Sequence, residues 1–221
     1  MNGPATGTAA DLAGADAVSL DCFGTLVDAE RPADPWTAVA DALASRGVDI
    51  PPEWESLYRS SHADLARLEA QPLAEHVRAA LAAGGVECEP ATARVAVFAA
   101  FDGPVCVRDG ARRLVAALDV PVAVVSNCAV SDLVDRTLER AALAAAVDVV
   151  VTSVDCGRLK PHPRPFEVAA DRLDVPLADL VHVGDEAAAD GAAKRAGATA
   201  IVLDDVSLTD LVAALEGSPC R

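Results

Sequence analysis

The feature that most constrains the fold is a series of short, valine-rich apolar runs that alternate with helical stretches. Each run spans four to seven residues without strict apolar/polar alternation, as expected for strands buried on both faces of a parallel sheet. Intervening stretches, such as 131–146 and 165–173, carry helical periodicity and helix-start residues. The β-α-β-α pattern predicts a doubly wound α/β core. The five predicted strands are Ala17 to Asp21, Val120 to Ser126, Val147 to Val151, Leu180 to Gly184 and Ala198 to Leu203.

One interval interrupts this rhythm. Residues 29–103 contain no convincing strand, and their apolar spacing predicts helices over 36–46, 54–68, 73–83 and 91–101. The sequence therefore predicts an all-helical insert placed just after the first strand. The predicted organisation is a flexible leader at 1–10, an α/β core formed by 11–28 plus 104–221, and the insert at 29–103.

Composition excludes several classes of function. The 221 residues carry a formal charge of −16 and a pI near 4.5, so the chain has no basic surface for nucleic acid. The longest apolar stretches run about seven residues, against the ~20 that a membrane span needs. The first ten residues have no basic cluster and no long apolar segment, which argues against a secretory signal. We expect a soluble, cytoplasmic globular protein that binds neither nucleic acid nor membrane.

The charged residues are unusual in kind. The chain has 23 Asp and 11 Glu but 16 Arg and only two Lys, Lys160 and Lys194. Unbalanced charge repels itself and so weakens the compact state at low salt. In molar salt the screening length falls to about 3 Å, which largely removes this repulsion. The pattern resembles proteins of salt-accumulating haloarchaea and predicts a halophilic protein. A GC-rich genome, which also favours Ala, Arg and Asp, is the alternative explanation.

Candidate reactive residues follow four of the five apolar runs. In parallel sheets, ligands bind beyond the carboxyl ends of the strands, so these residues are expected to meet at one edge. The set combines a carboxylate nucleophile, hydroxyl and amide groups, a cation and an acidic pair. In chain order they are Asp21, Ser126 with Asn127, Lys160, and Asp185 with Asp190.

This series, in this order, resembles the haloacid dehalogenase-like (HAD) hydrolase superfamily over the whole chain after the leader. The first motif of that family is an apolar strand followed by Asp-x-Asp-Gly-Thr-Leu or a variant, and the segment Val18-Ser-Leu-Asp-Cys-Phe-Gly-Thr-Leu-Val-Asp28 matches it. Ser126 matches the second motif and Lys160 the third, while Gly-Asp185 with Asp190 matches the fourth. The resemblance implies a Rossmann-like core with a helical cap formed by the insert.

The resemblance also implies roles for these residues. Asp21 would be the nucleophile that forms a covalent ester, and Lys160 would keep it ionised and help to bind the substrate. Mg²⁺ would be held by Asp21, the backbone carbonyl of Phe23 and Asp185, with Asp190 at or next to the ion. The remaining substrate-site residues would be Ser126, Asn127 and Thr25, the last bracing the loop.

Two departures from the family pattern leave the reaction open. Phosphatases of the family place a second Asp two residues after the nucleophile, whereas this chain has Phe23, which cannot act as an acid. The 2-haloacid dehalogenases place an aromatic residue there, because halide leaves without a proton. Against that, Asp185 and Asp190 form a metal-binding pattern that those dehalogenases lack, and no substrate-binding arginine and aromatic set is evident.

We therefore favour a Mg²⁺-dependent phosphatase of small phosphorylated metabolites. The alternatives are a 2-haloacid dehalogenase acting on a halogenated metabolite and a catalytically silent protein that binds a phosphometabolite or a partner. A monomer or a homodimer is expected.

Most candidate residues also have a purely structural interpretation. Asp21 suits a strand-end turn, Ser126 and Asn127 suit a helix cap, and Asp190 suits a helix N-terminus. His182 lies within a predicted buried strand and is expected to be a hydrogen-bonded core residue. The cap candidates for choosing a substrate are Trp36, Arg59 and His62.

Overall fold

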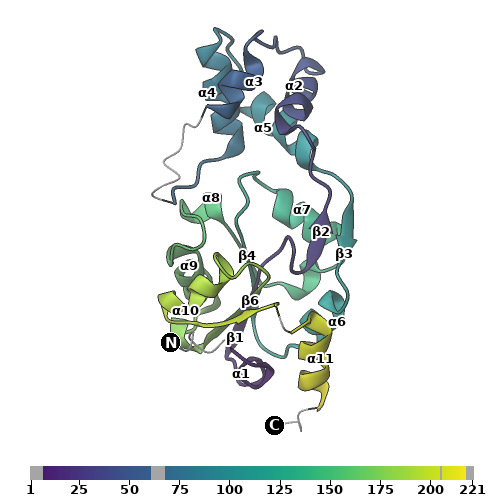
Figure 1. The fold of residues 1–221 in the computed structure, drawn as a ribbon, viewed down its shortest axis with the longest axis vertical. Helices are drawn as coiled ribbons and strands as arrows, with labels where there is room; N and C mark the ends of the chain where they lie inside the picture. Colours follow the sequence, from purple (N-terminus) through teal and green to yellow (C-terminus); the bar gives the residue numbers. More distant parts are fainter. Residues whose placement is uncertain (1–6, 61–67, 205, 218–221) are drawn as a thin grey trace.

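A five-stranded sheet forms the centre of the molecule (Figure 1). The structure, a computed structural model, describes residues 7–60, 68–204 and 206–217. The strand order is β5-β4-β1-β6-β7, and every neighbouring pair is parallel. The strands are β1 (Ala17–Leu20), β4 (Val122–Ser126), β5 (Val149–Thr152), β6 (Leu180–Gly184) and β7 (Thr199–Val202). Each overlaps one of the five predicted runs, with ends that agree to within two residues, so the α/β prediction is confirmed.

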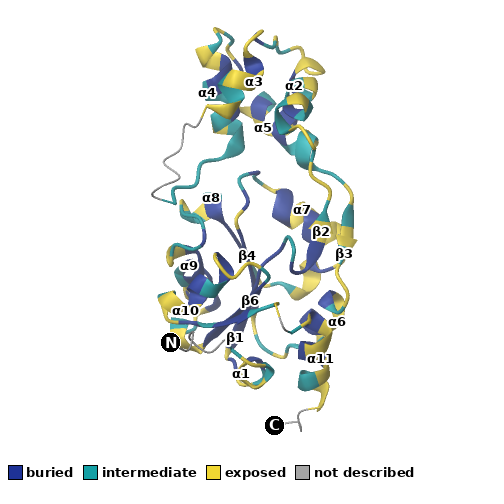
Figure 2. Ribbon diagram, viewed as in Figure 1, coloured by how far each residue is buried: buried dark blue, intermediate teal, exposed yellow. Residues whose placement is uncertain are grey.

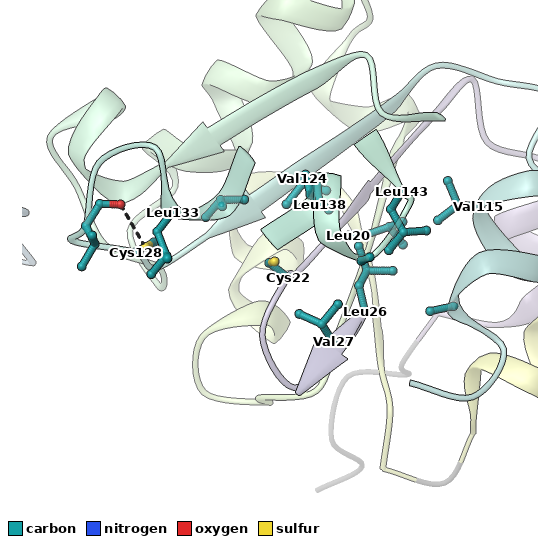
Figure 3. Packing of buried hydrophobic residues seen from close by; sticks show 14 of the residues in the cluster. Leu20, Cys22, Leu26, Val27, Val115, Val124, Cys128, Leu133, Leu138 and Leu143 are labelled. Carbon is teal, nitrogen blue, oxygen red and sulfur yellow. Dashed lines mark hydrogen bonds between the residues drawn. The ribbon is translucent and has the colours of Figure 1, made fainter. Parts of the chain in front are cut away.

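The central strands are buried on both faces, as their apolar sequences predict. Every residue of β1, β4 and β6 is buried, and successive residues pack into two different clusters on opposite faces of the sheet. Leu20 and Val124 pack with Leu26, Leu138 and other apolar residues on one face (Figure 3). Ala17, Ala123 and Phe166 pack on the other face.

Helices cover both faces of this sheet (Figures 1 and 2). Helix α9 (Arg164–Leu173) packs against β1, β4 and β5, while α6 (Ala111–Ala117) and α1 (Ala9–Ala13) both pack against α11 (Leu208–Gly217). The other helical elements of the sheet domain are α7 (Leu133–Arg140), η2 (Ala144–Ala146), α8 (Ser153–Cys156), η3 (Leu177–Asp179), η4 (Asp190–Ala192) and α10 (Ala193–Ala196). Helix α1 begins inside the expected leader, whose first six residues lie outside the described residues.

Helices fill the insert between β1 and β3, which is consistent with a helical cap. They are α2 (Pro35–Ala44), α3 (Trp54–Arg59), α4 (Leu73–Ala83) and α5 (Pro90–Phe101). Helix α5 packs against both α2 and α4, and the indole N–H of Trp54 donates to the carbonyl of Trp36 at 2.7 Å. A short antiparallel ribbon of β2 (Val27–Ala29) and β3 (Val105–Val107) joins the insert to the sheet domain. The sequence did not predict this ribbon.

A second connection joins the insert to the sheet domain. The N–H of Leu159 donates to the carbonyl of Leu68 at 2.9 Å, and the N–H of Ala70 donates to the carbonyl of Gly157 at 3.2 Å. Between these bonds, Glu69 pairs with Arg158 both along the backbone and through an ion pair of 3.5 Å. We call residues 68–70 and 157–159 the clasp. It lies immediately before Lys160 in the chain.

Among the described residues, no helix is both long enough and apolar enough to span a membrane.

Candidate active site

Asp21 lies directly after the central strand β1, where the sheet order places it between the ends of β4 and β6. Its N–H donates to the carbonyl of Val183 at 2.9 Å, so the backbone is fixed by the neighbouring strand. The residue is 8% exposed. A carboxylate with so little water around it needs a partner, and Lys160 supplies one at 2.8 Å.

Lys160 is held by three acceptors. Its Nζ donates to Oδ1 of Asp21 at 2.8 Å, to Oδ1 of Asp190 at 2.6 Å and to the carbonyl of Val125 at 2.9 Å. An ammonium has three protons, so these three bonds use all of them. The side chain is 2% exposed, which leaves it one fixed position. The peptide bond from Lys160 to Pro161 is cis.

Burial and charge act in opposite directions on these groups. Burial raises the pKa of Asp21 to about 6, the charge of Asp190 adds to the rise, and Lys160 opposes it. Burial lowers the pKa of Lys160, but the two carboxylates outweigh that effect and raise it above its ordinary value. Burial alone would raise the pKa of Asp190, yet bonds from His182 and Lys160 hold it below its ordinary range. The ammonium is therefore charged at neutral pH.

Asp185 completes a group of three carboxylates. One oxygen each from Asp21, Asp185 and Asp190 lies within 4.8 Å of the others, a spacing that suits a divalent cation. Thr25 orients Asp185 by donating to its Oδ1 at 2.8 Å. Gly24, with φ of +89°, permits this arrangement, because a Cβ at that position would overlap the Asp185 carboxylate.

Asp190 is held by the protein on both of its oxygens. Oδ1 accepts from Lys160 and lies 3.0 Å from Nε2 of His182, and Oδ2 accepts from the N–H of Glu186 at 3.0 Å. The residue is 1% exposed and begins η4. Both oxygens of the Asp190 carboxylate are therefore hydrogen-bonded within the protein.

Asn127 holds the loop that carries Lys160. Its Oδ1 accepts from the N–H of Lys160 at 2.7 Å, and its Nδ2 donates to the carbonyl of the same residue at 2.9 Å. Ser126, the last residue of β4, is 3% exposed and lies beside Thr152 of β5. The substrate contacts predicted for Ser126, Asn127 and Thr25, and the metal contact predicted for the Phe23 carbonyl, remain predictions.

A cavity of about 160 Å³ lies beside Phe23, between the sheet domain and the insert. Asn127 and Cys128 line it from the end of β4, and Leu73 and Phe101 line it from the insert. Arg31 also lines it, with the guanidinium carbon 5.7 Å from the centre of the Phe23 ring. Three further cavities among the described residues, of about 720, 660 and 360 Å³, are larger but lie at the surface. Arg59 lines the one of about 660 Å³, and Asp21, Lys160 and Asp185 line none of the three.

Sequence reasoning missed two features of this region. It did not find Arg31, because only the fold shows that residue beside Phe23. It predicted His182 to be a hydrogen-bonded core residue, which is confirmed, but it did not identify Ser19 and Asp190 as the partners. A polar residue two positions before Asp21 in a buried strand was the available signal, because side chains at i and i+2 share one face of a strand.

Trp36 and Arg59, two of the cap candidates, do not line the cavity beside Phe23. Arg59 stacks on Trp36, with its guanidinium carbon 3.9 Å from the ring centre, and bonds Glu55 at 2.9 Å. His62 lies outside the described residues.

The chain matches the model of a known protein family. The model of the haloacid dehalogenase-like hydrolases matches residues 15–197, most of the chain. This chain belongs to that family. The HAD family consists of hydrolases, and membership implies a small-molecule substrate. A search of curated proteins gave no match.

Solved HAD structures share this fold across nearly their whole length. A 2-haloacid dehalogenase from Pseudomonas syringae pv. tomato DC3000 is 23% identical, with a TM-score of 0.66 and coverage of 91% of this chain and 98% of that chain. CbbY from Rhodobacter sphaeroides, in complex with phosphate, is 22% identical, with a TM-score of 0.60 and coverage of 91% and 99%. A HAD phosphatase from Thermococcus onnurineus is 18% identical, with a TM-score of 0.58 and coverage of 93% and 100%. The similar structures include both dehalogenases and phosphatases, so they establish the fold and leave the reaction to the chemistry of the site.

Proposed function

We propose that this HAD hydrolase is a Mg²⁺-dependent phosphatase of small phosphorylated metabolites, with Asp21 as the nucleophile. The single observation that supports this most strongly is the grouping of three carboxylates within 4.8 Å. Among the described residues, Lys160 is the one cation that is paired with two of them. The ionised cluster therefore has an excess of two negative charges, which repels a phosphate dianion unless a further cation is present.

The donor set fits Mg²⁺. Hard divalent cations prefer carboxylate and carbonyl oxygens, and Mg²⁺ commonly uses one or two protein carboxylates together with waters and phosphate oxygens. Asp21, Asp185 and the backbone carbonyl of Phe23 are the proposed ligands. Asp190, whose two oxygens already accept three hydrogen bonds from the protein, is proposed to neutralise and position Lys160. A bound Mg²⁺ would neutralise charge on the phosphate and so permit attack by an anion.

The side chains define the remaining chemistry. Because Lys160 bonds Oδ1 of Asp21, Oδ2 is the oxygen that we propose attacks phosphorus. The new bond joins Oδ2 to phosphorus, the ester P–O bond breaks, and the leaving oxygen departs with the bonding electrons. Water then attacks phosphorus and releases phosphate, which restores the Asp21 carboxylate. The Lys160 ammonium faces Asp21 throughout, so it also lies near the transferred group.

Phe23 sets the class of substrate. It lines the cavity where the leaving group would lie, and it cannot donate a proton to the leaving oxygen. Water must supply that proton, which favours leaving groups that are stable as anions. We expect enzyme activity to rise steeply as the leaving group becomes more acidic.

Phe23 is also the observation that favours the second candidate, a 2-haloacid dehalogenase. A halide needs no proton, and Arg31 beside Phe23 offers a cation for a carboxylate or halide. In that reaction Asp21 would attack carbon and displace halide, and no metal would be needed.

Hydrolysis of p-nitrophenyl phosphate in high-KCl buffer, with and without Mg²⁺, tests the proposal. We expect turnover that requires Mg²⁺, is abolished in Asp21→Asn and falls sharply in Asp185→Asn. Asp171→Asn, which changes an exposed carboxylate on α9, is the matched control and should leave turnover unchanged. Folded protein that gives no turnover with Mg²⁺ would contradict the phosphatase proposal. Halide release from a 2-haloacid in the presence of chelator would establish the dehalogenase instead.

A further inference from the structure

Buried hydrogen bonds connect Ser19, His182 and Asp190 beneath the active site. Oγ of Ser19 lies 2.9 Å from Nδ1 of His182, and Nε2 of the same ring lies 3.0 Å from Oδ1 of Asp190. Ser19 and His182 are fully buried, and Asp190 is 1% exposed. Ser19 on β1 and His182 on β6 are direct partners in the sheet register, so the backbone itself sets their spacing.

The direction of these bonds follows from the chemistry of the groups. The Asp190 carboxylate, which accepts from Lys160, can only accept, so Nε2 of His182 must carry the proton. Burial lowers the pKa of His182, and the ring is therefore neutral near pH 7. Nδ1 is then an acceptor and receives the Ser19 hydroxyl proton. Ser19 thus selects the tautomer of His182 that donates to Asp190.

These bonds fix Asp190, and Asp190 in turn fixes Lys160. Without His182, the Asp190 carboxylate would retain the Glu186 N–H on Oδ2 but lose one of the two donors on Oδ1. Its position determines where the Lys160 ammonium lies between Asp190 at 2.6 Å and Asp21 at 2.8 Å. A shift in Asp190 would therefore change the geometry of the nucleophile.

We propose that His182, oriented by Ser19, is a positioning residue that holds Asp190 so that the Lys160 ammonium faces Asp21. This inference rests on the proposed role of the Asp21–Lys160 pair and extends it to two residues that touch no substrate. A packing role alone would need only the volume of the ring, which contacts Phe166 edge-on with ring centres 4.9 Å apart.

Three variants separate positioning from packing. His182→Leu keeps apolar volume and removes the donor to Asp190, whereas His182→Gln keeps an N–H that can reach it. Phe166→Leu disturbs packing on the same ring without removing a hydrogen bond. We expect kcat for p-nitrophenyl phosphate to fall about 10- to 100-fold in His182→Leu with KM nearly unchanged, as for a misplaced reacting group. It should recover largely in His182→Gln and stay near wild type in Phe166→Leu.

A readout independent of turnover uses the chain's two lysines. With ¹⁵N-labelled lysine, the buried Lys160 ammonium should give a slowly exchanging signal, and exposed Lys194 provides the reference. We expect this Lys160 signal to shift or broaden in His182→Leu but not in Phe166→Leu, and ¹⁵N shifts of His182 should report the Nε2–H tautomer. An unchanged Lys160 signal in a folded His182→Leu protein, or equal effects of the His182→Leu and Phe166→Leu changes, would overturn the positioning role. Absence of turnover in the wild type, with these spectra as expected, would overturn the phosphatase proposal alone.

Discussion

At the scale of single residues, two carboxylates of the candidate site lie against glycines, where the absence of a Cβ leaves room for them. Gly24 faces the carboxylate of Asp185, and Gly184 faces that of Asp190, so a Cβ at either glycine would displace an acid. Gly24 carries a second requirement, because its φ of +89° is rarely adopted by other residues. The glycines of the two motifs therefore leave the space that the two carboxylates occupy.

Gly24→Ala tests this requirement. We expect unfolding free energy to fall by more than the ~1–2 kcal/mol that positive φ alone costs a non-glycine residue, and the thermal stabilisation by Mg²⁺ to disappear. Gly47→Ala is the matched control, since Gly47 has φ of +77° with open space around it and should show only the backbone cost. Equal losses in the two variants, with the Mg²⁺ effect intact in both, would refute the argument. Urea denaturation and thermal melts with and without Mg²⁺ provide the measurements.

Phe23→Asp should change the preference for leaving groups. A carboxyl group at this position could protonate the leaving oxygen, and general acids contribute about 10²–10⁴-fold. We expect kcat/KM for an alkyl phosphate to rise about 100-fold, with a much smaller change for p-nitrophenyl phosphate. Phe23→Asn has nearly the same shape but no titratable proton and should give no gain. If Phe23→Asn matched Phe23→Asp, the cause would be space in the cavity rather than acid catalysis.

At the scale of elements, the end of β4 organises the loop that presents Lys160. Asn127 follows β4 and bonds both the N–H and the carbonyl of Lys160, as the backbone of a neighbouring strand would. Asn127 also lines the cavity beside Phe23, so the same residue contacts both the loop and the cavity.

Asn127→Ala should therefore affect both stability and turnover. Loss of the two bonds leaves partly buried backbone groups unpaired, which typically costs about 1–3 kcal/mol. We expect a decrease of that size in unfolding free energy, measured by urea titration, together with a lower kcat. Ser45→Ala removes one exposed bond to the carbonyl of Ala42 and should change stability by much less. A stability change in Asn127→Ala no larger than in this control would contradict the proposal that Asn127 holds the backbone of Lys160.

Elements also explain how far the sequence could predict the structure. Buried parallel strands have a strong local signal, and the runs at 17–21 and 180–184 gave β1 and β6 to within one residue. The ribbon of β2 and β3 has only three residues per strand, and it forms because the insert returns to the place where it left. Likewise, Asp21 and Lys160 were predictable from their positions after apolar runs. The Ser19–His182 contact depends on the register between two strands 163 positions apart, which no local pattern encodes.

At the scale of the whole molecule, charge and fold make opposing demands. A formal charge of −16 destabilises a compact chain through self-repulsion, and Asp supplies most of the acidic residues. We predict that the melting temperature rises as KCl increases from about 0.1 M to about 2 M, because the screening length falls from about 10 Å to a few Å.

A surface variant isolates the electrostatic part of this effect. Four exposed acids can be changed together to Asn, which lowers the excess of negative charge by four: Asp41, Asp49, Asp119 and Asp171. We expect this variant to be more stable than wild type at low salt and to depend less steeply on KCl in thermal melts. A parallel salt dependence in both proteins would assign the effect to general salting-out.

The clasp has a mechanical consequence for the whole molecule. If the β2–β3 ribbon alone joined the insert to the sheet domain, the insert could rotate about that ribbon. In the clasp, the backbone bonds of Leu159 to Leu68 and of Ala70 to Gly157 connect the two parts at a second place. If the insert moved away from the cavity, it would either break these two hydrogen bonds of the clasp or displace residues 157–159, which end one position before Lys160. The clasp therefore couples the position of the insert to the backbone that presents the Lys160 ammonium.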